Sequence, residues 1–159
     1  MKKLLVLITA LTMSTASFAA ATGDIVISGI VEAAISIALS TNTYSTLDIV
    51  NGGDHSVAIA TETCSDLAGY KIYGYSVNGS ELINTTSSAN KTAYTIKYDG
   101  AVAGVSLGAG SANRVELKDS GTLTASTTDT STVVVDVTAF AAAPAGTYSD
   151  TITLQIEAN

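Results

Sequence analysis

Side chains that build catalytic and metal sites are scarce in this sequence. It contains one histidine, one cysteine, one proline and no tryptophan among 159 residues. A zinc site needs three or four ligands, mostly nitrogen or sulfur, so His55 and Cys64 cannot form an ordinary one within a single chain. No Asp-x-Asp-x-Asp loop of the calcium-binding type occurs either. We therefore expect neither a metal nor a cofactor.

Because Cys64 is the only cysteine, the chain cannot form an internal disulfide. We expect its side chain to act as a small hydrophobe buried in a strand. A reactive thiol or a bridge between two chains is the alternative. Stability must then come from packing and strand pairing.

Basic residues are also scarce. Seven Lys and Arg stand against fourteen Asp and Glu, which gives a net charge of −7. Lys2 and Lys3 belong to a segment that we expect to be removed, so the mature chain is more acidic still. It has no basic cluster, which makes nucleic acid and anionic membrane surfaces poor partners. The remaining basic residues are Lys71, Lys91, Lys97, Arg114 and Lys118.

The run Gly53-Asp54-His55-Ser56 places an acid, a base and a nucleophile next to one another. Adjacent side chains on a strand point to opposite faces, and catalytic triads draw their members from distant segments. We interpret the run as a polar turn between two strands. With no other general base or cofactor loop available, we expect the protein not to be an enzyme.

The first residues have the layout of a secretory signal peptide. Met1-Lys2-Lys3 precedes an apolar run over 4–11, and small residues follow at 17–21. We predict a signal peptide over 1–21, cleaved after Ala19 or Ala21, and an exported protein. No apolar stretch reaches the roughly 20 residues that a membrane-spanning helix needs, so we expect no membrane insertion.

Apolar and polar residues alternate with a period of two through the mature chain, and no stretch of similar length has helical spacing. Turn residues separate the alternating segments at Asn51-Gly52-Gly53-Asp54, Asn78-Gly79-Ser80 and Asp99-Gly100. About eight or nine short strands separated by turns are typical of a β-sandwich. We predict an all-β domain with strands after the first at 44–50, 56–61, 69–77, 93–99, 114–118, 122–124, 132–138 and 148–158.

The alternation is longest at the start of the mature chain, where every odd position over 25–39 is apolar or glycine. One strand of that length would extend about 50 Å, far beyond the usual five or six residues, so we divide it at Gly29. If 35–39 is the first strand of the domain, an apolar face preceding it has no place in that domain. Its side chains are Ile25, Ile27 and Val31.

The last segment alternates in the same way. Its odd positions from Thr151 to Glu157 are polar, whereas its even positions are mostly apolar. We predict that the even side chains face the core. They include Ile152, Leu154 and Ile156.

Three segments resemble one family. The ending Pro144-Ala145-Gly146-Thr147-Tyr148-Ser149-Asp150-Thr151-Ile152-Thr153-Leu154 is similar to the tail of the spore coat protein U family and of the related archaic chaperone/usher pilins. The segments Gly69-Tyr70-Lys71-Ile72, with the turn over 76–82, and Ala93-Tyr94-Thr95-Ile96-Lys97-Tyr98-Asp99-Gly100 resemble strands of those pilins in the same order.

The resemblance implies an immunoglobulin-like β-sandwich that lacks its last strand and is completed by the N-terminal extension of a neighbouring subunit. On this interpretation 22–31 is the donor-strand segment and 32–159 is the sandwich domain. Family members bridge a first-strand cysteine to one at the position of Cys64, but Ile35 stands where the first would be expected. The penultimate residue, usually aromatic in related pilins, is Ala158.

We therefore expect a structural subunit of a bacterial surface pilus, or fimbria, assembled by donor-strand exchange and supporting adhesion or biofilm formation. The donor side chains would be Ile25, Ile27 and Val31, with Gly29 between them, and the last strand would form the edge that a chaperone binds. The expected partners are copies of the same chain, a periplasmic chaperone and an outer-membrane usher. The alternative is a self-sufficient secreted β-sandwich of a coat or matrix.

Overall fold

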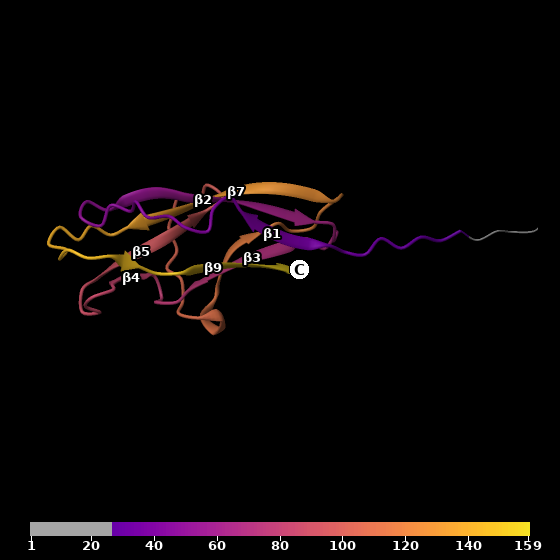
Figure 1. Ribbon diagram of the computed structural model, residues 1–159. Helices are drawn as coiled ribbons and strands as arrows, with labels where there is room; N and C mark the ends of the chain where they lie inside the picture. Colours follow the sequence, from indigo (N-terminus) through magenta and orange to yellow (C-terminus); the bar gives the residue numbers. More distant parts are fainter. Residues whose placement is uncertain (1–26) are drawn as a thin grey trace, which may run out of the picture. The chain divides into compact units, whose positions relative to one another are not determined.

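The computed structural model describes residues 27–159, and the protein is all-β over this range (Figure 1). Residues Glu32–Asn159 form one compact unit. The signal peptide predicted over 1–21 and the donor residue Ile25 lie outside the described residues. The strands are β1 (Ile35–Leu39), β2 (Gly53–Cys64), β3 (Tyr70–Ser76), β4 (Glu81–Asn84), β5 (Lys91–Tyr98), β6 (Val115–Asp119), β7 (Thr127–Val137), β8 (Tyr148–Ser149) and β9 (Ile152–Ala158), with a single 3-10 turn at Ser111–Asn113.

The strands form two antiparallel sheets that pack face to face, an arrangement consistent with a β-sandwich. The larger sheet has the order β1-β2-β7-β5-β4-β8 and the smaller has the order β6-β3-β9. Tyr70 and Ile72 of β3 pack in one core with residues of the larger sheet, among them Ile96 and Val133. The core therefore lies between the sheets.

The alternation predicted from the sequence is confirmed in the central strands. Tyr94, Ile96 and Tyr98 of β5 are buried, as are the inward-facing valines of β7. The glycine turns are confirmed too, because Gly79 and Gly100 have φ of 67° and 74°, a backbone conformation that other residues adopt only with strain. Cys64 is buried, as expected for a small hydrophobe.

Two predicted strands are wrong. Residues 44–50 contain no strand, although β1 covers only Ala60–Cys64 of this edge of β2. The backbone N–H of Asp48 donates to the His55 side chain instead of to the backbone of β2. Residues 122–124 form no hairpin with β6, because β6 pairs with β3 and the chain then crosses to the other sheet at Thr127. Strand β4 was not predicted, since four residues are too few for a clear alternation.

The interpretation of His55 as a turn residue is also wrong. Strand β2 begins at Gly53, so Asp54 and His55 are strand neighbours. Asp54 accepts hydrogen bonds from Lys97, while His55 Nε2 accepts the backbone N–H of Asp48 at 3.3 Å. The three side chains of the run do not converge, as argued from strand geometry.

The terminal segment, predicted as one strand, is divided at Asp150. Strand β8 belongs to the larger sheet and β9 to the smaller, so the chain changes sheets between them. The Asp150 carboxylate holds this crossing in place. It accepts the backbone N–H of Thr151 at 2.7 Å, the backbone N–H of Asn78 at 3.0 Å and the hydroxyl of Tyr94 at 2.8 Å.

Candidate functional site: an open groove between β1 and β9

Each sheet ends in a strand on the same side of the sandwich. β1 is the edge of the larger sheet, β9 is the edge of the smaller sheet, and the two lie next to one another without pairing (Figure 1). β9 is hydrogen-bonded to β3 along one edge only. A seam between the sheets is therefore open along two unpaired strand edges.

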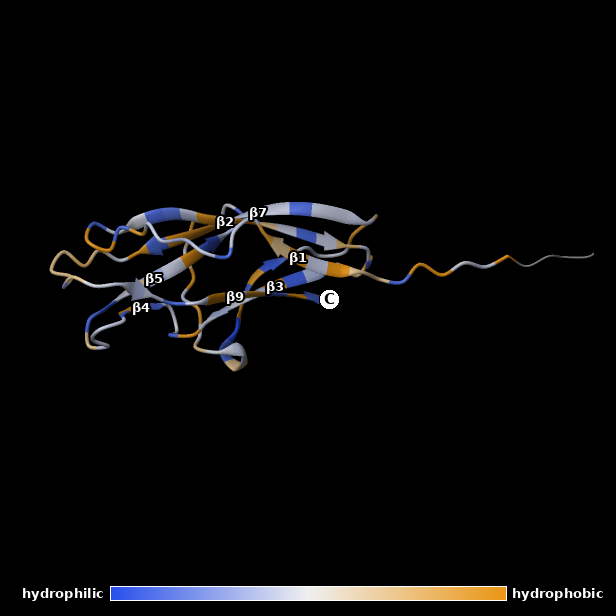
Figure 2. Ribbon diagram, in the orientation of Figure 1, coloured by the Kyte–Doolittle hydropathy of each residue, from blue (hydrophilic) through white to orange (hydrophobic). Residues whose placement is uncertain are grey.

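Both strands turn apolar side chains toward this seam, and neither strand is fully covered. Ile37 on β1 and the three predicted core residues of β9 pack against the core but are only half-buried, whereas Ile72 on the central strand β3 is 0% exposed. Ile35 and Leu39 remain 36% and 45% exposed. Figure 2 shows apolar, orange stretches on both strands. The β9 residues are Ile152, Leu154 and Ile156.

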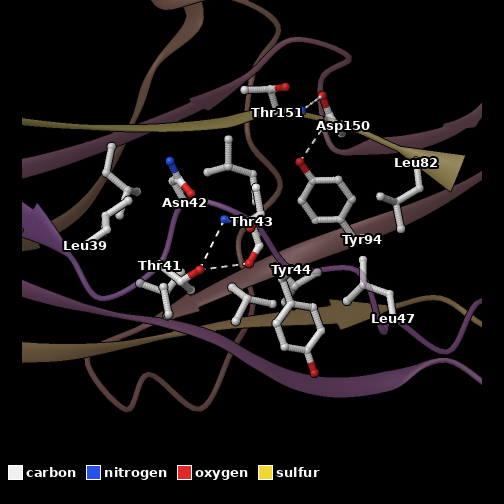
Figure 3. A pocket seen from close by; sticks show the side chains of 16 residues that line it. Leu39, Thr41, Asn42, Thr43, Tyr44, Leu47, Leu82, Tyr94, Asp150 and Thr151 are labelled. Atoms are coloured by element: carbon white, nitrogen blue, oxygen red, sulfur yellow. Dashed lines mark hydrogen bonds between the residues drawn. The ribbon is translucent and has the colours of Figure 1, made fainter.

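A groove of about 210 Å³ lies at one end of the seam, where Leu39 ends β1 and Ile152 begins β9. Figure 3 shows Leu39 and the segment from Thr41 to Leu47 on one side of it and Asp150 with Thr151 on the other. Its floor is apolar. The floor residues come from β2, β4, β5 and β7 and are Val57, Ala58, Leu82, Tyr94, Val133 and Val135.

The segment 41–47 on the groove wall makes no backbone–backbone hydrogen bond to any other described residue. Its local support comes from Thr41, whose Oγ1 donates to the carbonyl of Thr43 at 2.9 Å and accepts that residue's N–H at 3.3 Å (Figure 3). Backbone groups on both sides of the groove, on this segment and on β9, are thus available to a strand that entered it.

Tyr94 supplies the polar end of the groove floor. Burial raises the pKa of its hydroxyl, and the neighbouring Asp150 carboxylate adds to this rise, so the hydroxyl stays protonated and donates to Asp150. Both groups are satisfied by each other and by the backbone. The groove therefore presents shape and apolar surface rather than reactive groups.

The described part of the predicted donor segment is exposed. The side chains of Ile27 and Val31 are 89% and 91% exposed. Ile30, which alternates with them in the sequence, is 93% exposed. A Cβ atom added to Gly29 would meet nothing within 4 Å. Ile27 and Val31 of this segment and Ile35 and Leu39 of β1 thus all have exposed apolar side chains.

Sequence reasoning missed a buried polar network at Glu62. This side chain is 0% exposed and accepts hydrogen bonds from Tyr70 at 2.7 Å, from Tyr98, and from Lys118 at 2.8 Å. Burial alone would raise the pKa of Glu62, but these donors outweigh it and hold the pKa below its usual range. The alternation of Ala60, Glu62 and Cys64 could have placed Glu62 on the inner face.

The sequence also did not reveal which carboxylates the basic residues contact. In the described range 27–159 each of the five forms an ion pair, and the most connected is Lys118, whose Nζ contacts Glu62, Asp99 and Asp129. Burial would lower the pKa of Lys118, but the three carboxylates raise it well above the ordinary value. The other pairs are Lys71 with Glu116 and Asp119, Lys91 with Glu81, Lys97 with Asp54 and Asp136, and Arg114 with Glu157.

Within residues 27–159 no group of three or more His, Cys, Asp or Glu side chains is arranged to hold a metal ion. Over the same residues, no helix has the length and apolarity to cross a membrane. No protein-family model matches the chain, and a search of curated proteins finds no relative. The groove and the exposed N-terminal segment are therefore the features on which a function can be argued.

Proposed function

We propose that this protein is a non-enzymatic structural subunit of a bacterial surface fibre, assembled by donor-strand exchange. In this proposal the sandwich is an incomplete immunoglobulin-like domain of the pilin type. The apolar face of 22–31 of one subunit fills the groove between β1 and β9 of the next. The observation that carries the proposal is the open seam, whose two strand edges are unpaired and whose apolar side chains are half-exposed.

Energetics support this pairing of segment and groove. Burying Ile25, Ile27 and Val31 at about 1.5–3 kcal/mol each would contribute on the order of 5–9 kcal/mol. Strand addition would also pair the free backbone edges of β9 and of the segment 41–47. An unfilled seam of this kind promotes aggregation, which supports a periplasmic chaperone and an outer-membrane usher as partners during export to the cell surface.

The link between the donor segment and β1 supports exchange between subunits over self-completion. Folding back into its own groove would require the segment to reverse direction within Glu32-Ala33-Ala34. These residues include none of the Gly, Pro, Asn, Asp or Ser that tight turns favour. An extended link would instead carry the segment to a neighbour. The resulting homopolymer is suited to adhesion or to biofilm formation.

The experiment compares two substitutions in the donor segment. Ile27→Asp places a carboxylate on the face that would be buried, and Ile30→Asp places one on the opposite face. We expect cells making the Ile27→Asp variant to lose fibres in electron micrographs while the monomer stays folded, and the Ile30→Asp variant to keep them. Wild-type levels of fibres from Ile27→Asp would refute donor-strand exchange.

The second candidate is the self-sufficient sandwich of a coat or matrix. It is favoured by the absence of any family-model match and by an aliphatic Ala158 where related pilins have an aromatic side chain. Under this alternative the segment completes its own domain, so Ile27→Asp would unfold the monomer. Circular dichroism of the purified variant separates the two functions.

A further inference from the structure

Lys118 ties the two sheets together from outside the groove lining. It lies on β6, which is the edge of the smaller sheet opposite to β9. Its Nζ is 2.8 Å from Glu62 Oε2 and 2.6 Å from Asp129 Oδ2, and these carboxylates belong to β2 and β7 of the larger sheet. It also lies 3.0 Å from Asp99 Oδ2, just beyond the end of β5. One ammonium group therefore bridges the sheets.

The buried carboxylate at the centre of this network receives a second bond across the sheets. Tyr70 on β3 donates to Glu62 from the smaller sheet, whereas Tyr98 on β5 donates to it from within the larger sheet. Among the described residues no buried side-chain nitrogen or oxygen lacks a hydrogen-bond partner. A fully satisfied buried network fixes its members in one arrangement.

One wall of the groove is Leu39 with the segment 41–47 that follows β1, and the other includes Ile152 and Leu154 of β9. The width of the groove therefore depends on how the two sheets sit relative to each other. β1 belongs to the larger sheet and β9 to the smaller, and no backbone pairing joins them. None of the network residues lines the groove. The cross-sheet bonds of Lys118 and Tyr70 therefore reach the groove walls through neighbouring strands, because Tyr70 is paired with Ala158 of β9 and Glu62 is paired with Ile37 of β1.

We propose that Lys118 is a positioning residue that sets the width of the groove from outside the groove lining and thereby its affinity for a donor strand. The inference rests on the proposed function and adds to it a determinant outside the binding surface. Removing the ammonium group releases β6 from the larger sheet. The sheets can then separate at the groove, and an inserted strand loses contact with one wall.

The test measures binding of a synthetic peptide of residues 22–31 to the full mature chain carrying Ile27→Asp, which keeps an intact groove but cannot donate. In this background we expect Lys118→Met to weaken peptide binding about tenfold, at a temperature where circular dichroism shows the protein folded. A purely stabilising role would lower Tm and leave the Kd of the folded protein unchanged. Lys118→Arg should restore part of the affinity.

Two matched controls isolate the link between the sheets. Lys71→Met removes a lysine whose partners, Glu116 and Asp119, lie on β6 in its own sheet, and should leave Kd unchanged. Tyr70→Phe should weaken binding more than Tyr98→Phe, because only the first breaks a bond between sheets. If the Lys118→Met variant does not fold, the comparison of Tyr70→Phe with Tyr98→Phe decides whether a bond between the sheets sets the affinity for the peptide.

Equal affinities across the lysine variants, or across the tyrosine pair, overturn the positioning role while leaving donor-strand exchange intact. A parent protein that does not bind the peptide at all overturns donor-strand exchange itself, and the positioning role with it.

Discussion

Ile35 on β1 lies directly opposite Cys64 on β2 in the antiparallel register. This is the position at which the resemblance to spore coat protein U and archaic pilins implies a first-strand cysteine. Directly opposed residues in an antiparallel pair have Cα atoms about 4.5–5.5 Å apart, within the roughly 4.4–6.8 Å that a disulfide spans. The register can therefore accept the bridge that the sequence lacks.

We predict that Ile35→Cys forms a disulfide with Cys64 under oxidising conditions. The bridge should raise the free energy of unfolding by about 2–4 kcal/mol, less the contribution of the half-exposed isoleucine. Thiol titration and non-reducing peptide mapping check the bond. Ser36→Cys is the control, because Ser36 is paired with Thr63 and points to the outer face. A free thiol pair in Ile35→Cys would contradict the register.

Leu154 and Gln155 test the orientation of β9. Leu154 packs against the core, whereas the Gln155 side chain donates to Glu157 on the surface. We expect Leu154→Asp to prevent folding, since burying an unpaired carboxylate costs several kcal/mol, a large share of the stability of a small domain. Gln155→Asp should be mild. Equal loss of soluble protein from both variants would mean that the register is shifted by one residue.

The Glu62 network should make stability depend on acid pH. Because the pKa of Glu62 is lowered in the folded protein, its contribution is fully present above the unfolded pKa of about 4.3 and is lost as pH falls through the folded pKa. Glu62→Gln should lower Tm at about pH 7, and the difference from the wild type should shrink by about pH 3. Parallel melting curves across that range would show that Glu62 carries no such linkage.

His55 should be dispensable for assembly. Its Nε2 accepts one long hydrogen bond from the backbone of Asp48, and its ring lies near that of Tyr44. We expect His55→Ala to cost about 1 kcal/mol of stability at most and to leave fibre formation intact. Loss of fibres from a folded His55→Ala variant would assign this histidine a role that its contacts do not explain.

Local sequence patterns predicted those parts of the fold that depend only on residues close together in the chain. Alternation placed Tyr94, Ile96 and Tyr98 on the inner face, and glycines marked the turns, because both effects depend on neighbouring residues. The prediction of a strand at 44–50 failed because a strand also needs a partner backbone, and this segment pairs with none although β1 leaves part of the edge of β2 free. Lys118 and Glu62 lie 56 residues apart in sequence, so their contact depends on the packing of two sheets.

The sequence pointed to a groove only through the apolar face of the proposed donor segment. The surplus apolar face of Ile27 and Val31 could be read in the sequence, and the residues that line the groove could not. They come from six strands and from the irregular segments 41–47 and 150–151, which the fold alone brings together.

Gly29 gives the sharpest test of the donor segment, because it separates assembly from folding. It lies between Ile27 and Val31 on the face that would enter a neighbour's groove. In the single chain a Cβ at this position meets nothing within 4 Å, and its φ lies outside the range that favours glycine. A larger side chain should therefore leave the monomer unchanged.

In a filled groove the same side chain would have to fit between the donor backbone and the floor. A missing side chain lets a backbone approach bulky core residues closely, and Tyr94 is the largest residue on that floor. We expect Gly29→Leu to abolish fibres and Gly29→Ala to reduce them, with monomer Tm unchanged in both. Size-exclusion chromatography and electron microscopy of the exported protein measure this. Normal fibres from Gly29→Leu would mean that this face of the segment does not enter the groove.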